Sequence, residues 1–214
     1  MIRVFKSGNI PTSLFTKKAY DEEDVKQQLL DDQHEKCYIC ERKRDTDFVI
    51  EHLKSQKNND ALKYDWYNLL YACNYCNQKK SDKYDNILNP INENIEDKIK
   101  QELYFDGKKA VFTASDSSDN QQTKTAELLN SIFGNASKLK KIKEQRLFAQ
   151  LLSVINDFNG KIKSYLENPQ ADLANAIKAE LSINAEFLGF KYWIIKSNNN
   201  LNSVFAQDII WNKQ

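Results

Sequence analysis

The chain has 214 residues, 41% of them hydrophobic and 29% charged, enough for one ordinary core or a small core with an extension. Its 31 basic and 30 acidic side chains leave a formal charge of +1, which gives no support to unaided nucleic-acid binding. Any DNA contact is therefore expected to be local or shared with a partner. Neither a secretion signal nor the ~18 uninterrupted apolar residues of a membrane helix is found, so we expect a cytoplasmic protein without membrane contact.

The first part of the sequence predicts an arm, a helix and then a strand–loop–strand–helix block. Residues 1–15 are expected to form an extended arm, and apolar residues at helical spacing predict a helix over 21–34. The block itself is expected to contain a strand at 47–50 that leads into residues 51 and 52, a loop at 55–60, a strand at 69–72 and a helix at 74–84.

The second part predicts a hairpin followed by helices. The hairpin is expected at residues 103–112 with its turn at Gly107. The expected helices cover 125–133 (ending at Gly134), 138–159 (ending near Gly160), 171–182, 185–196 and 204–211.

All four cysteines belong to two matched pairs, Cys37-x2-Cys40 and Cys73-x2-Cys76. In a reducing compartment such pairs favour metal ligation over disulfides. A redox pair would need a helix start in a thioredoxin-like setting, which the sequence does not supply for both pairs. The spacing predicts a closed, four-thiolate structural zinc site that takes no part in chemistry.

The residues between the cysteines suit phosphodiester hydrolysis. His52 is one of only two histidines and can accept a proton near neutral pH. Glu51 and Asn77 offer the hard oxygen ligands that a divalent cation prefers. Taken singly, a His beside a Glu is usually a surface or ion-paired residue, and an Asn after a Cys is usually a turn former. Their order inside the cysteine frame, together with Asn68, favours a nuclease site. Because side chains alternate along a strand, the end of the strand must bend for Glu51 and His52 to converge.

This segment resembles the HNH endonucleases, also called ββα-metal or His-Me finger nucleases, whose motif is an acid–His pair, a middle Asn and a final His or Asn on a helix. The resemblance implies that His52 is the general base and that Asn68 holds the loop and the base in position. It also implies that Glu51 and Asn77 bind one catalytic cation, and an amide oxygen favours Mg²⁺ or Mn²⁺ there.

The fold implied is α+β, with a zinc-stapled ββα-metal HNH core and a mostly α-helical C-terminal region. The expected division is an N-terminal arm and helix at 1–36, the HNH core at 37–86, and a hairpin with helices at 87–214 that provides partner docking.

The match is closer to the PtuB-like nucleases of Septu antiphage systems and of some retrons. Residues 50–57, 66–69 and 73–80 are similar to motifs of that branch, although the loop after His52 lacks its proline. This resemblance implies DNA as substrate and a PtuA-like ABC-type ATPase as controlling partner. In a retron it also implies a reverse transcriptase with its RNA–DNA hybrid. Lys80 matches the branch pattern and, with Lys79, is expected to contact DNA.

Two other functions remain open. A non-catalytic zinc-finger module could bind nucleic acid or protein, but it would have no use for Glu51, Asn68 and Asn77 together. A stand-alone restriction-type nuclease would need a stronger basic surplus than this chain carries.

Overall fold

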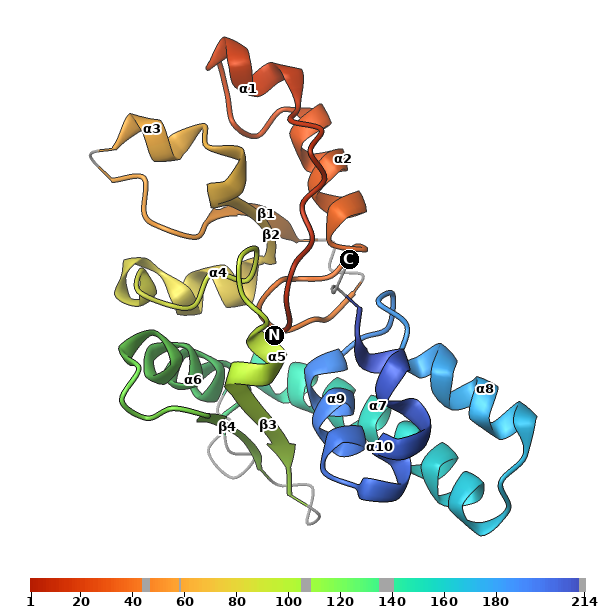
Figure 1. Cartoon of the computed structure of the whole chain (residues 1–214). Helices are drawn as coiled ribbons and strands as arrows, with labels where there is room; N and C mark the ends of the chain where they lie inside the picture. The colour runs from red at the N-terminus through yellow and green to blue at the C-terminus, as the bar shows by residue number, and fades with distance from the viewer. Residues whose placement is uncertain (44–46, 58, 105–108, 135–140, 212–214) are drawn as a thin grey trace.

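The computed structural model describes residues 1–43, 47–57, 59–104, 109–134 and 141–211. Within this part, the fold is α+β, and its strands form two separate two-stranded sheets. Figure 1 shows the first sheet beside the N-terminal helices, the second sheet against α6, and helices α7 to α10 packed together next to it. None of the helices described combines the length and the hydrophobicity needed to cross a membrane.

The first sheet and the helix after it form the predicted ββα unit. Strand β1 (Phe48–His52) pairs antiparallel with β2 (Leu69–Cys73), with His52 opposite Leu69. Every residue of β2 is buried, as expected from its apolar run. Helix α4 (Asn74–Lys80) begins directly after β2, where the Cys73 sulfur accepts a hydrogen bond from the Cys76 amide. Short elements complete this block, namely α3 (Asp60–Lys63) and the 3₁₀ helices η1 (Trp66–Asn68) and η2 (Asp82–Tyr84).

The N-terminal segment packs along this block. Helix α2 (Glu23–Asp32) confirms the predicted helix. The extended arm is shorter than expected, because residues from Thr12 form helix α1 (Thr12–Thr16). Asp24 stabilises the start of α1, since its carboxylate accepts hydrogen bonds from the Ser13 amide and hydroxyl at 3.1 and 2.6 Å.

The arm is also tied to the β1–β2 loop. The Lys6 ammonium lies over the Trp66 ring, 3.1 Å from its centroid, and donates to the Leu69 carbonyl at 2.9 Å. A cation above an indole face is attracted by the ring quadrupole. The arm is thereby held at the point where η1 joins β2.

The predicted hairpin is formed by β3 (Ile99–Leu103) and β4 (Ala110–Ala114), which pair antiparallel. Its strands run further from the turn than expected, and the expected turn at Gly107 lies outside the described residues. Helix α5 (Ile95–Lys98) precedes the hairpin, and α6 (Asn120–Phe133) follows it. Helix α6 begins earlier than predicted because the Asp119 carboxylate caps it, accepting from the amides of Gln121 and Gln122.

The C-terminal helices depart from the predicted ends, most clearly at two places. Helix α7 (Ile142–Glu167) continues through Gly160, because the buried Phe158 and Ile162 on either side anchor the helix to a core. The glycine costs only about 1 kcal/mol of helix propensity. The last helix begins earlier than expected, because Asn198 caps it and so starts a helix instead of a loop. The remaining helices are α8 (Ala171–Glu180), α9 (Leu188–Lys196), α10 (Asn199–Phe205) and the 3₁₀ helix η4 (Ala206–Ile209).

Two buried clusters hold these elements together. The first extends from Met1 to Phe190 and contains the ββα unit, α6 and the start of α7. The second joins the end of α7 to α8, α9 and α10. Phe187 and Phe190, however, belong to the first cluster, where both rings pack against Phe133. The C-terminal region therefore completes the core around the ββα unit as well as forming its own.

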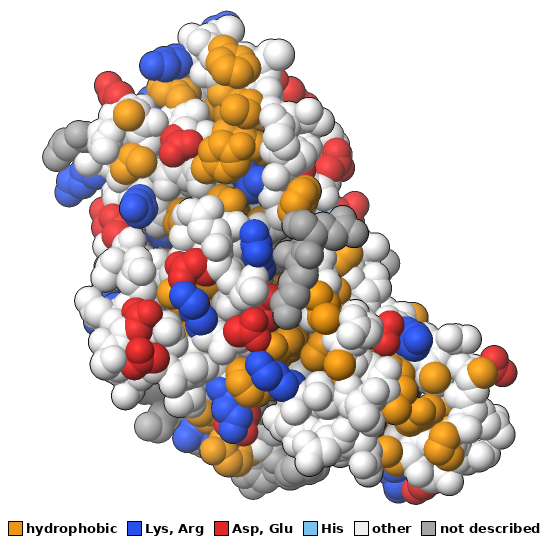
Figure 2. All heavy atoms as spheres, viewed as in Figure 1, with side chains coloured by type: hydrophobic (Ala, Val, Ile, Leu, Met, Phe, Trp, Pro, Cys, Tyr) orange, Lys and Arg blue, Asp and Glu red, His pale blue; other side chains and the backbone are white. Residues whose placement is uncertain are grey.

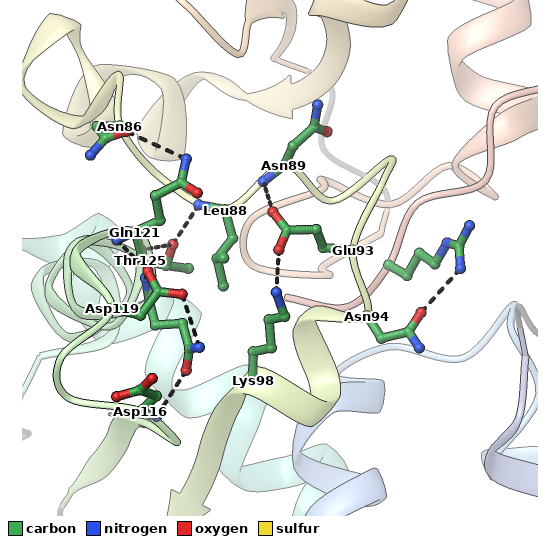
Figure 3. A network of polar contacts seen from close by, with 12 residues as sticks. Asn86, Leu88, Asn89, Glu93, Asn94, Lys98, Asp116, Asp119, Gln121 and Thr125 are labelled. Atoms are coloured by element: carbon green, nitrogen blue, oxygen red, sulfur yellow. Dashed lines mark hydrogen bonds and ion pairs between the residues drawn. The ribbon is translucent and has the colours of Figure 1, made fainter.

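Polar contacts fix the segment that connects α4 to β3 (Figure 3). The Leu88 amide donates to the Thr125 hydroxyl of α6 at 2.9 Å, and Glu93 forms an ion pair with Lys98. Tyr75 of α4 donates its hydroxyl to the Ile132 carbonyl at 2.9 Å. Helix α4 is therefore braced on the side that faces α6.

Candidate active site

The four cysteines gather at one point between the first sheet and α4. Cys37 and Cys40 lie on a tight turn, closed by a hydrogen bond from the Glu41 amide to the Cys37 carbonyl at 2.8 Å. Cys73 ends β2, and Cys76 lies in the first turn of α4. All four are buried, and their sulfur atoms lie within 4.8 Å of one another. With Zn–S bonds of about 2.3 Å, these sulfurs are positioned to bind one zinc ion.

Glu51 faces α4, where its partner is Lys80. The Lys80 ammonium lies 2.8 Å from Glu51 Oε1, and burial raises the pKa of Glu51 while the charge of Lys80 acts in the opposite direction. Lys80, an expected DNA contact, is buried and only 1% exposed in this structure. Lys79 is also engaged, by Glu144 of α7 at 3.0 Å. Both expected DNA-contacting lysines therefore have partners inside the protein.

His52 contacts different elements from Glu51, as alternation along a strand predicts. Its Nε2 atom lies 3.1 Å from the Lys63 carbonyl, and its ring packs edge-to-face against Tyr20, with centroids 4.8 Å apart. A carbonyl only accepts hydrogen bonds, so Nε2 carries the hydrogen and Nδ1 is left to accept a proton. Burial lowers the pKa of His52, which favours the neutral imidazole that a general base requires.

Asn68 braces the loop between the two strands. Its Oδ1 accepts from the Lys54 amide at 2.8 Å, and its Nδ2 donates to the carbonyls of Lys54 and Leu62 at 3.0 and 2.9 Å. Leu62 is the neighbour of Lys63, whose carbonyl contacts His52. The Asn68 side chain thus fixes the piece of backbone that orients the imidazole.

The oxygen donors around Lys80 are the kind that Mg²⁺ or Mn²⁺ binds. Besides Glu51, the Lys80 ammonium is near the His52 carbonyl at 3.1 Å and Asp85 Oδ1 at 3.7 Å. Asp85 Oδ1 is buried without a hydrogen-bond partner, so it has capacity for a cation. Half-buried Asn77 lies three residues before Lys80, which places both on one face of α4. The carboxylate and carbonyl oxygens around Lys80 fit a hard divalent cation.

Three groups that contact the candidate site residues could not be identified from the sequence. Tyr20 lies outside the motif segment, and the Lys63 contact uses a backbone carbonyl, which leaves no residue signal. Asp85 follows the motif without a fixed spacing that marks it as a partner of Lys80. These groups are identified only by the folded arrangement.

Removal of the metal from the cysteine site should unfold the ββα unit. Structural zinc contributes about 10–16 kcal/mol in small zinc peptides, comparable with or greater than the whole stability of most domains. We expect Cys73→Ser, or chelation of the wild type, to abolish cooperative thermal unfolding as followed by circular dichroism. A variant that kept both its zinc content and its melting temperature would contradict the structural role of the four-cysteine site.

Loss of the Asn68 amide should destabilise the loop. Asn68→Ala leaves one amide and two carbonyls without their partner, so we expect a loss of about 1–3 kcal/mol in urea unfolding of the zinc-loaded protein. Asn77→Ala is the matched control and should change stability by less than about 0.5 kcal/mol. Equal losses in the two variants would mean that Asn68 has no special bracing role.

The comparison with protein families agrees with this geometry. Residues 37–83 match the family model of the HNH endonuclease, from the first cysteine of the zinc site to just beyond Lys80. No curated protein matches the chain. The matched segment includes the cysteines, the acid–His pair and both asparagines, but neither Tyr20 nor Asp85. Residues 37–83 are therefore similar to the HNH endonuclease domain.

Proposed function

We propose that this protein is a metal-dependent HNH endonuclease that hydrolyses phosphodiester bonds of DNA, with His52 as its general base. The observation that carries the proposal is the fixed imidazole of His52, held by the Lys63 carbonyl in a loop that Asn68 braces. A zinc module that only binds would need no oriented base. The family match to residues 37–83 supports the same conclusion.

The residues around His52 suit proton transfer from water. Nδ1 accepts the proton, while the Lys63 carbonyl holds the Nε2 hydrogen and stabilises the imidazolium that forms. The edge-to-face contact with Tyr20 restricts rotation of the ring, so less orientational freedom is lost in reaching the reactive geometry.

Glu51 and Asn77 are the residues proposed to hold the catalytic Mg²⁺ or Mn²⁺. When bound, such a cation offsets phosphate charge and stabilises the leaving oxygen. The hard oxygen donors beside α4 support this assignment. The separate thiolate site is proposed to hold structural Zn²⁺, since soft sulfur ligands and hard oxygen ligands select different ions.

The finer role proposed is that of a nuclease effector in antiphage defence, controlled by a PtuA-like ABC-type ATPase. The motif similarity to PtuB-like nucleases supports this role. In the face that Figure 2 shows, basic and acidic side chains are interleaved without a continuous basic area. That distribution matches the formal charge of +1 and supports DNA capture with a partner rather than alone. In a retron setting, a reverse transcriptase and its RNA–DNA hybrid would join the assembly.

A non-catalytic zinc module is the second candidate. The Glu51–Lys80 ion pair favours it, because a carboxylate already neutralised by a lysine can serve packing alone. Cleavage activity separates the two candidates directly.

The catalytic proposal is tested by replacing each histidine with asparagine. His52→Asn removes the base, so plasmid cleavage in Mg²⁺ or Mn²⁺ should fall by about 10²-fold or more, with zinc content and fold retained. His34→Asn is the control and should cleave normally, because asparagine tolerates the positive φ of 53° at that position. Unchanged cleavage by His52→Asn would reject His52 as the base.

The partner proposal is tested by co-expression with an ABC-type ATPase encoded beside the gene for this chain. We expect the two proteins to purify together and DNA cleavage by the complex to depend on ATP. Separate elution of the two, with cleavage indifferent to the ATPase, would leave a stand-alone nuclease.

A further inference from the structure

Lys80 is a buried cation at the end of α4 that the proposed chemistry does not use. An ammonium group that is 1% exposed loses its hydration and must be compensated by oxygen atoms of the protein. The compensation comes from Glu51 Oε1 at 2.8 Å, the His52 carbonyl at 3.1 Å and Asp85 Oδ1 at 3.7 Å. These partners come from β1 and from the segment after η2, so Lys80 ties α4 to both.

These partners are also the ligands that a hard divalent cation takes. Two carboxylates face a single ammonium, so one negative charge is left over when all three groups are ionised. Asp85 Oδ1 has no hydrogen-bond partner, although it is buried. The surroundings of Lys80 are therefore an oxygen-lined cation site whose present occupant is a side chain.

We propose that Lys80 is the internal counter-cation of the catalytic site, which holds the Glu51 carboxylate in the metal-free protein and competes with the divalent cation for it. The inference rests on the proposed function, because it takes Glu51 as a ligand of the catalytic cation. It assigns Lys80 a positioning role in place of a DNA contact.

The competition follows from charge and distance. A divalent cation on Glu51 and an ammonium 2.8 Å from the same carboxylate repel each other strongly in a buried setting. Either the ammonium moves away as the metal binds, or the metal binds more weakly because the ammonium stays. Removal of the lysine charge strengthens metal binding in both cases. Because Lys80 also donates to the His52 carbonyl, its displacement changes a contact of the strand that carries the base.

The chain offers two lysines as controls. Lys79 is the neighbour of Lys80 on α4, but its ammonium pairs with Glu144 instead of Glu51. Lys191 is another fully buried lysine, and its ammonium pairs with Glu180 in the C-terminal region. Lys79 controls for removal of a lysine from this helix. Lys191 controls for the general response of a buried ammonium to added metal.

The first experiment measures Mn²⁺ binding to zinc-loaded protein by the electron paramagnetic resonance signal of free Mn²⁺. We expect Lys80→Met to bind Mn²⁺ at least about tenfold more tightly than the wild type. Lys79→Met should bind like the wild type, and Glu51→Gln should lose the site. Equal affinity in Lys80→Met and the wild type, with binding lost in Glu51→Gln, would overturn the role of Lys80 and leave the catalytic metal site standing. Absence of Mn²⁺ binding to both the wild type and Lys80→Met would overturn the role of Lys80 and the catalytic metal site together.

The second experiment uses the wild-type protein and does not depend on the folding of a variant. Lysine ammonium signals are followed by nuclear magnetic resonance while Mg²⁺ is added to the zinc-loaded protein. The Lys80 signal should shift with the same midpoint as Mg²⁺ binding, and the Lys191 signal should stay in place. A Lys80 signal that is unchanged at saturating Mg²⁺ would contradict the proposal.

Discussion

Convergence of four sulfur atoms is the constraint on which the rest of the site depends. It joins the turn at Cys37 and Cys40 to the junction between β2 and α4, two places far apart in the sequence. The start of α4 is fixed in this way, and the rest of the helix is then directed along β1. Lys80 owes its position beside Glu51 to that direction. A site built from two short strands and two turns of helix would not hold its geometry without such a cross-link.

The two sides of β1 provide different environments. On the side of α4, Glu51 lies among oxygen donors and a buried ammonium, which is an environment for a cation. On the side of the loop, His52 lies between Tyr20 and the Lys63 carbonyl, which is an environment for a neutral imidazole. Tyr20 belongs to the N-terminal segment, so the site uses residues beyond the 37–83 match. The contacts of the candidate site residues therefore extend beyond the segment matched in the sequence comparison.

The sequence predicts the features of the fold that short-range patterns determine. The cysteine spacing, the two strands, α2 and the start of α4 follow from local periodicity and matched motifs, and the structure confirms them. The helix predicted at 74–84 ends at Lys80, because Ser81 adopts a positive φ of 41°. The sequence could not predict the burial of Lys80, because a lysine at a helix end is ordinarily solvated until a distant carboxylate meets it. The sequence also predicts a helix end near Gly160, but α7 continues through it. Packing of the neighbouring Phe158 and Ile162 outweighs the weak preference of one glycine. Backbone groups such as the Lys63 carbonyl carry no residue signal at all.

The first buried cluster has a consequence for the order of protein synthesis. It contains Met1 and Phe190, and the Glu41 carboxylate next to the zinc turn accepts a hydrogen bond from the Gly189 amide at 3.2 Å. A ribosome delivers the N-terminal half first, so this half emerges before the residues that finish its packing. A nascent chain that ends before Phe190 lacks part of the first cluster. The packing around the ββα unit is therefore completed only after Phe190 has left the ribosome.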